Sequence, residues 1–146
     1  MLFRSALVFL VVQKRNLTRL FKVGAGQQGR YTNVPPGTAI DVVPDANFWL
    51  VAHYALQGTA RVPSYHILCN EPNRDPAANA PRLEMEDIVQ FTYDLCHGHF
   101  KCTRSVSVPS PVYFADLAAE RAASLYGRGV FLGKDFDEVQ SRRLFF

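Results

Sequence analysis

Hydrophobic residues in the first half of this chain predict three β-strands. The apolar run from Leu7 to Val12 is unbroken, which is typical of a strand that is buried on both faces. Phe48 to Ala55 and Ser64 to Cys69 are two further strand candidates, and the Gly58-Thr59 pair between them marks a turn. We therefore expect this half of the chain to form a sheet.

Two segments rich in turn-forming residues interrupt the strands. Gly24 to Gly37 holds four glycines and two prolines, and Asn70 to Pro81 is rich in proline and asparagine. Such compositions favour irregular, exposed backbone. The sequence therefore predicts a long loop in each place.

Two helices are expected in the second half, from Leu83 to about His97 and from Pro111 to about Tyr126. The first has acidic residues near its start, where the helix dipole favours them, and Pro111 suits the first turn of the second. The apolar positions at helical spacing are Ile88, Phe91, Thr92, Leu95 and Cys96 in the first helix, and Phe114, Leu117, Ala118 and Leu125 in the second. Prolines keep the intervening KCTRSVSVPSP from being helical. Strands followed by helices indicate a mixed α/β architecture.

Composition places the chain among globular proteins. Its 146 residues are enough for one domain with a core, and 48% of them are hydrophobic and 20% charged. The apolar run after Arg4 resembles a signal peptide, but Gln13 and Lys14 follow it in place of a cleavage site, and the run is too short to span a bilayer. We expect instead a chain that begins in the middle of a domain, with no membrane partner.

Three cysteines, Cys69, Cys96 and Cys102, form an odd set with no disulfide framework, which favours a reducing compartment and hence the cytoplasm. The cluster Cys96-His97-x-His99-x-x-Cys102 offers zinc ligands, but structural zinc sites draw on two separated ligand pairs and no second pair exists. We therefore interpret it as a buried cysteine followed by histidines at a helix end.

Charge is distributed unevenly although the net charge is only +3. The first carboxylate is Asp41, and before it stand six cations: Arg4, Lys14, Arg15, Arg19, Lys22 and Arg30. A segment with positive charges and no carboxylate favours the binding of a polyanion, and a solvated charged surface is the alternative.

Cations and hydroxyl groups gather in three clusters, and phosphate recognition needs both kinds of donor. The clusters are Lys14, Arg15, Thr18 and Arg19; then Arg61; then Lys101, Thr103, Arg104, Ser105 and Ser107. The aromatic residues Tyr65 and Tyr113 are candidates to pack against sugars or bases. The residues themselves therefore indicate an α/β domain that is a candidate for binding nucleic acid.

Asp116 is the remaining candidate for chemistry, early in the second predicted helix. A carboxylate there normally compensates the helix dipole or caps the helix, and metal binding is the alternative. A metal-dependent nuclease needs several carboxylates that converge on two ions, and one helix does not supply them.

Four strings, in family order across about residues 7 to 123, resemble the Piwi domain of eukaryotic Argonautes. VVQKRNLTRLF resembles the family's VVQKRHHTRLF and departs from it at Asn16 and Leu17. The others are NVPPGTAID, HYALQGTARVPSYHIL and LCHGHFKCTRSVSVPSPVYFADLAAERA. The resemblance implies the later portion of an RNase H-like Piwi domain, with a mixed sheet and flanking helices, over residues 7–126, and it leaves residues 127–146 unassigned.

The resemblance also implies a function, which is binding of a guide small RNA in RNA-mediated gene silencing. Target RNA and the Mid domain of the same protein are the implied further partners. By resemblance, the residues along the guide are Lys14, Arg15, Arg19, His53, Arg61, Lys101, Arg104 and Tyr113, and Arg121 reaches the pocket of the 5′-phosphate. Two departures, Lys101 in place of an arginine and the relaxed Ala60-Arg61-Val62, predict a weaker grip on phosphates.

Asp116 takes the fourth place in the family's catalytic site, which holds Mg²⁺ with two aspartates and a glutamate as well. In the family those three lie N-terminal to VVQKR, so we expect no cofactor and no cleavage by this chain alone. Two alternatives stay open: a fragment of a metal-dependent RNA slicer whose remaining catalytic residues lie upstream, and a non-binding relic or interaction fragment that exposes a strand edge and apolar surface.

Overall fold

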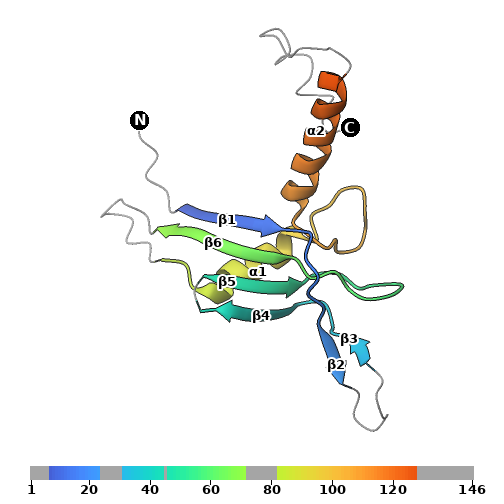
Figure 1. Cartoon of the computed structure of the whole chain (residues 1–146). Coiled ribbons are helices and arrows are strands. Elements are labelled where there is room, and N and C mark those ends of the chain that lie inside the picture. Colours follow the sequence, from blue (N-terminus) through green and yellow to red (C-terminus); the bar gives the residue numbers. More distant parts are fainter. Residues whose placement is uncertain (1–6, 24–30, 45, 72–81, 128–146) are drawn as a thin grey trace. The chain divides into compact units, whose positions relative to one another are not determined.

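The computed structural model describes residues 7–23, 31–44, 46–71 and 82–127 (Figure 1). The chain divides into two compact units, Met1–Pro109 and Ser110–Phe146. Among the described residues, the first unit holds the strands and one helix, and the second holds one helix. Each unit is described by itself.

A four-stranded sheet is the centre of the first unit. Its strands lie in the order β1-β6-β5-β4, and each neighbouring pair is antiparallel. The bounds are Leu7–Gln13 for β1, Thr38–Val43 for β4, Asn47–Val51 for β5 and Ser64–Glu71 for β6. Two short strands, β2 (Phe21–Val23) and β3 (Tyr31–Asn33), pair as a separate antiparallel ribbon.

Strand β1 confirms the expected strand but not its expected burial. Its side chains alternate between half-buried and exposed, and Phe9 is 54% exposed. Val8, Leu10 and Val12 pack against the core, whereas Leu7, Phe9 and Val11 point to the other face of the sheet. Burial on both faces was the wrong prediction because, within the described residues, the core covers only one face of this strand.

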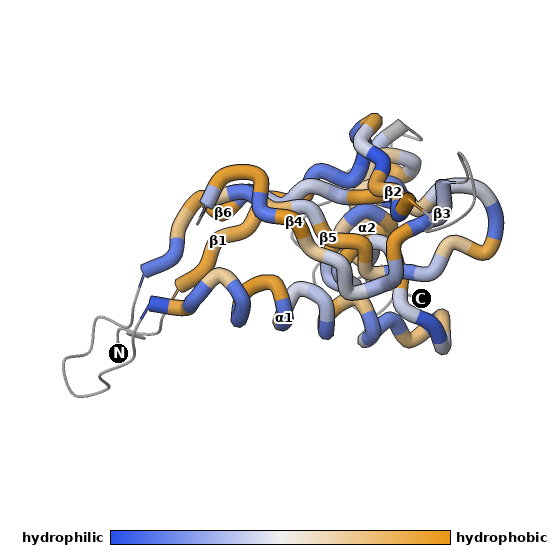
Figure 2. The backbone as a smooth tube through the Cα atoms, turned by 90° about the horizontal axis from the view of Figure 1, so that it is seen from below, coloured by the Kyte–Doolittle hydropathy of each residue, from blue (hydrophilic) through white to orange (hydrophobic). Residues whose placement is uncertain are grey.

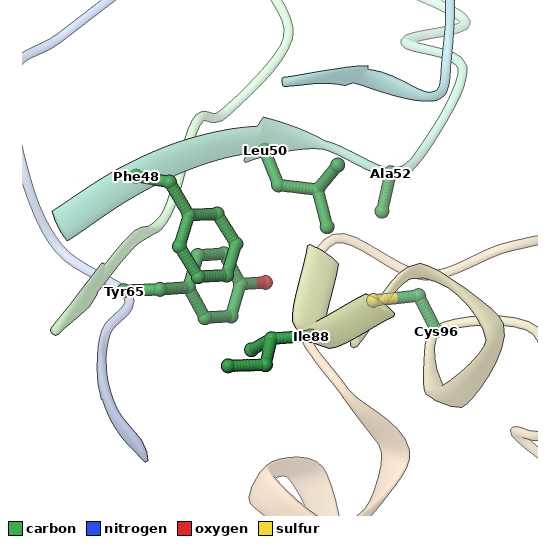
Figure 3. Close-up of a cluster of buried hydrophobic side chains, with 6 residues drawn as sticks. All are labelled: Phe48, Leu50, Ala52, Tyr65, Ile88 and Cys96. Carbon is green, nitrogen blue, oxygen red and sulfur yellow. The ribbon is translucent and has the colours of Figure 1, made fainter. Parts of the chain in front are cut away.

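Helix α1 (Met85–Leu95) confirms the first expected helix and covers one face of the sheet (Figure 2). It buries Ile88 and Thr92, and Ile88 packs in one cluster with Phe48, Leu50 and Tyr65, which Ala52 and Cys96 complete (Figure 3). The rings of Phe48 and Tyr65 stack with centroids 4.7 Å apart and planes 7° apart. Such a pair stabilises the fold by about 1 kcal/mol beyond the burial of its area.

The structure corrects three further sequence predictions. Phe91 was expected on the buried face of α1 but is 64% exposed. The expected loop from Gly24 to Gly37 contains β3, and strand β4, which follows it, was not predicted. Strand β3 has only three residues, and Asp41 interrupts the apolar run of β4, so neither pattern carries a strong strand signal by itself.

The boundaries of two other predicted segments also change. Strand β5 ends at Val51 and not at Ala55. Strand β6 extends to Glu71, so the loop predicted from Asn70 begins later; its residues 72–81 lie outside the described part. Residues 24–30 and the unassigned tail from residue 128 also lie outside it.

Turn chemistry connects the ribbon to β4. Gly37 has a φ of +88°, and the amide of Thr38 donates to the carbonyl oxygen of Pro35 at 3.3 Å. Proline and then glycine at the two central positions are typical of a type II turn. This turn starts β4 beside β5, and the Gly37 amide donates to the Val51 carbonyl oxygen at 2.8 Å.

Helix α2 (Ser110–Gly127) confirms the second expected helix, with Pro111 in its first turn as predicted. Within the described residues, neither helix is both long enough and apolar enough to cross a membrane.

Candidate nucleic-acid interface

Two cationic segments lie side by side at one end of the sheet because of how β1 and β6 pair. The last residue of β1, Gln13, is the register partner of Ser64, the first residue of β6, and the Ser64 hydroxyl donates to Gln13 Oε1 at 3.2 Å. Residues 14–19 leave the sheet at this point and residues 61–63 enter it (Figure 1). The pairing therefore brings the first two predicted basic clusters together.

Asn16 joins the two segments. Its Nδ2 donates to the carbonyl oxygen of Val62 at 2.8 Å, and its Oδ1 accepts from the backbone amide of Thr18 at 3.1 Å. The second bond is an asparagine turn, in which the side chain satisfies the backbone two residues on. Asn16 was noted in the sequence only as a departure from the family string, and its bridging role was missed.

Arg19 folds back on the same loop. Its Nη1 donates to the carbonyl oxygens of Asn16 at 3.1 Å and Thr18 at 2.7 Å. One nitrogen of the guanidinium thus holds the loop, and an arginine carries five N–H donors in all. Arg19 therefore combines a structural role with the capacity to bind an anion.

These segments enclose a hollow of about 510 Å³, which we call the basic hollow. The described residues that line it are Lys14, Arg15, Asn16, Leu17, Arg19, Arg61 and Val62. Four of them carry a positive charge and none carries a negative one. Guanidinium and ammonium groups gathered around one hollow are suited to the oxygens of a phosphate chain.

Asn33 positions the segment that carries Arg61. Its Oδ1 accepts from the Ala60 amide at 3.0 Å, and its Nδ2 donates to the Gly58 carbonyl oxygen at 2.9 Å. Ala60 and Val62 are buried on either side of the exposed Arg61, which directs the arginine outward. Asn33 belongs to the NVPPGTAID string, but only the folded structure shows that its side chain binds the backbone of Gly58 and Ala60.

His53 lies within electrostatic reach of the basic hollow. It is half-buried, and its Nδ1 has no hydrogen-bond partner among the described residues. Burial lowers the pKa of His53 below its ordinary value of 6.5, and the positive charge of Arg61 lowers it further. An imidazole beside a cation becomes easier to protonate when an anion arrives, so His53 is suited to respond to a bound phosphate.

Lys101 and Arg104 stand in the loop between the two helices, and neither lines the basic hollow in the described structure. Both are exposed, and Lys101 Nζ lies 5.6 Å from the centre of the Phe100 ring. The amide of Val106 donates to the carbonyl oxygen of Cys96 at 2.9 Å, which ties the loop to the end of α1. Figures 1 and 2 both place this loop at the end of the sheet where β1 ends.

Tyr65, predicted to meet sugars or bases, is fully buried in the core instead. Its hydroxyl has no hydrogen-bond partner of ordinary geometry among the described residues and faces the Cys96 side of the cluster (Figure 3). The Cys96 thiol donates to the carbonyl oxygen of Thr92 at 3.3 Å, so the predicted buried cysteine is confirmed.

Helix α2 carries the remaining predicted residues. Tyr113 is half-buried, whereas Asp116 and Arg121 are exposed. Among the described residues, no three His, Cys, Asp or Glu side chains come together as metal ligands. The donor set in the described part therefore does not fit the magnesium site that the family implies, and Asp116 is an exposed carboxylate on α2 with Glu120 one turn on.

Comparison with known proteins gives the family. A model of the Piwi domain matches residues 2–127. The protein tag-76 of Caenorhabditis elegans is 42% identical over 125 residues, and protein argonaute 14 of Oryza sativa subsp. japonica is 40% identical over 127 residues. Each match covers 82% of this chain and 11% of the relative, so the chain spans about a ninth of the length of these relatives.

Solved structures show the same fold. The C-terminal lobe of a budding yeast Argonaute matches 96% of this chain and 28% of its own, at a TM-score of 0.64 and 24% identity. Argonaute of Kluyveromyces polysporus, solved with a guide RNA, matches 88% of this chain and 15% of its own, at a TM-score of 0.64 and 26% identity. The chain therefore belongs to the Piwi domain family and is a partial Piwi domain of an Argonaute, the later portion of an RNase H-like fold.

Proposed function

We propose that this chain binds the phosphate backbone of a guide small RNA at the basic hollow. The observation that carries the proposal is the meeting of Lys14, Arg15, Arg19 and Arg61 around one hollow, with no carboxylate among its described lining residues. The Kluyveromyces polysporus relative was solved with a guide RNA, which supports the choice of ligand. Contacts to phosphates carry no sequence information, so the grip suits guides of any sequence.

The wider role that we propose is RNA-mediated gene silencing in the cytoplasm, with target RNA paired to the guide and a Mid domain in the same protein. Lys101 and Arg104, in the loop between α1 and α2, are proposed to meet further phosphates. For Tyr113 and Arg121 on α2 the proposal rests on their match to the family strings. Cleavage of RNA is not part of the proposal, because the described carboxylates do not fit a magnesium site.

Salt dependence tests the proposal. The purified full chain would be titrated into labelled, 5′-phosphorylated single-stranded RNA at several salt concentrations, with fluorescence anisotropy as the readout. Neutralising phosphates releases counterions, and for single strands the slope of log K against log salt is about −0.7 per phosphate. Four contacts would give a slope of about −3. Binding that is absent at low salt, or that is insensitive to salt, overturns the proposal.

Two substitutions that each remove one positive charge test whether RNA binds at the basic hollow. Arg61→Ala should weaken binding and make the slope shallower by about 0.7, because one phosphate contact is lost. Arg82→Ala removes the same charge from an exposed residue beyond β6 that does not line the basic hollow, and it should leave affinity and slope unchanged. Equal effects of the two variants would show binding through net charge alone and would refute the assigned site.

A further inference from the structure

The β2–β3 ribbon presents an exposed aromatic pair. The ring centroids of Phe21 and Tyr31 are 6.0 Å apart and their planes are tilted by 58°. Phe21 is 43% exposed and Tyr31 is 66% exposed, and Val23, the register partner of Tyr31, is 71% exposed. Three apolar side chains on one face of a two-stranded ribbon thus face solvent together in the described structure, which makes this face a candidate binding surface.

Both strands of the ribbon are anchored at the basic hollow. Phe21 follows Arg19 by two residues, a distance of at most about 7 Å along the chain. Strand β3 ends at Asn33, whose side chain bonds Gly58 and Ala60 next to Arg61. Figures 1 and 2 both show the ribbon at the end of the sheet where β1 and β5 end. Both strands that carry the aromatic pair are therefore fixed beside the cations of the basic hollow.

Exposed aromatic rings next to a cationic track are what single-stranded nucleic acid needs. Every base has a π-face that stacks on a ring whatever its identity, while the phosphates follow the cations. Lys22, between Phe21 and Val23, is exposed, but strand alternation points its side chain to the other face of the ribbon, so the charges beside the rings are those of the basic hollow at its base. The charge beside the rings favours RNA over an apolar segment of a protein as their occupant.

We propose that Phe21 and Tyr31 form a stacking platform for bases of the RNA strand whose phosphates occupy the basic hollow. The proposal rests on the proposed function, since it assumes RNA in that hollow. It adds that unpaired bases, and not phosphates alone, contribute to binding. Loss of a base–aromatic stack weakens binding by about fivefold or more.

The test compares two ligands on the full chain: a single-stranded RNA and an abasic strand of equal length, which keeps ribose and phosphate but lacks bases. The double variant Phe21→Ala/Tyr31→Ala should bind RNA about fivefold or more weakly, with the salt slope unchanged because no phosphate contact is lost. Its affinity for the abasic strand should equal that of the unaltered chain. Phe91→Ala, which removes an equally exposed aromatic from α1, should change neither affinity.

A second variant separates stacking from packing. Phe21→Leu/Tyr31→Leu keeps apolar volume on the ribbon but removes both π-faces, so it should lose RNA affinity as the alanine variant does. Leucines that restore full affinity, or alanines that weaken both ligands equally, overturn the stacking proposal. If the unaltered chain binds neither strand, it is the proposed function that fails. If it binds RNA with the expected salt slope and the alanine variant binds equally well, only the stacking proposal fails.

Discussion

The side-chain amide of Asn16 donates a hydrogen bond of 2.8 Å to the carbonyl oxygen of Val62, across 46 residues of sequence. This bond ties the loop that carries Lys14 and Arg19 to the segment that carries Arg61. A hydrogen bond between two neutral groups thus fixes the distance between the cationic segments of the basic hollow. A neutral link neither competes with the cations for phosphates nor weakens with salt, so it should hold the two segments together at any ionic strength.

Asn16→Ala should loosen this arrangement. We expect the free energy of unfolding to fall by about 1 kcal/mol, the usual net value of one hydrogen bond, and more if the Val62 carbonyl stays unsatisfied. RNA affinity should fall while the salt slope is unchanged, because all cations remain. Urea denaturation and anisotropy titrations measure the two effects. Gln57→Ala, which removes an exposed amide in the neighbouring loop, is the control and should change neither stability nor RNA affinity. An unchanged RNA affinity in Asn16→Ala would contradict a role of the Asn16–Val62 hydrogen bond in binding.

His53 should make RNA binding depend on pH. Burial and then the charge of Arg61 lower its pKa below 6.5, so it is neutral at pH 7. A phosphate nearby favours the protonated form, so affinity should rise as the pH falls from 7 towards 5.5, by at most tenfold per pH unit for one proton. His53→Gln should abolish the rise in anisotropy titrations. An affinity of the unaltered chain that falls on acidification would disprove the coupling.

The same histidine should affect stability in the opposite direction. Because its pKa is lower in the folded chain than in the unfolded chain, its contribution is present above pH 6.5 and is lost as the pH falls below that value. Thermal melts of the RNA-free chain should therefore shift downward below about pH 6.5. His53→Gln should make that shift smaller; an identical shift would assign it to other groups.

The buried pair of Tyr65 and Cys96 should make the fold sensitive to alkali. Burial raises the pKa of Cys96 to about 11 from 9.0, and burial also raises the pKa of Tyr65. Above pH 9 the unfolded chain releases the thiol proton while the folded chain keeps it, so stability should decline from pH 9 through 11, by at most about 1.4 kcal/mol per pH unit for one proton. Melts of Cys96→Ala against pH should show a shallower decline. A decline that Cys96→Ala leaves unaltered would rule the thiol out as its source.

The two faces of β1 should respond differently to the same polar substitution. Phe9→Thr acts on the exposed face and should change the free energy of unfolding by less than about 1 kcal/mol, while it reduces self-association through the apolar sheet surface. Leu10→Thr acts one residue on, against the core, and should cost about 2 kcal/mol or more. Denaturation and light scattering measure both. Equal costs would mean that the two faces are equally buried.

The sequence predicted those helices and strands whose pattern of apolar residues is strong within the element itself. Both helices were located because apolar spacing and Pro111 act within one turn of chain. Strands β1, β5 and β6 were located because each carries a strong apolar run. Strands β2, β3 and β4 were missed because β2 and β3 have three residues each and Asp41 interrupts the apolar run of β4. Their own residues therefore carry a weak strand signal, and pairing with the neighbouring strand stabilises them.

The amino-acid sequence by itself determined the family strings, the cationic clusters and the two helices. Only the tertiary structure decided which of those clusters meet: it joins Lys14, Arg15 and Arg19 to Arg61, leaves Lys101 and Arg104 on another loop, and buries Tyr65. The reason is physical. Cations are placed along the chain one by one, but the hollow between them exists only after β1 pairs with β6 and Asn16 reaches the carbonyl oxygen of Val62.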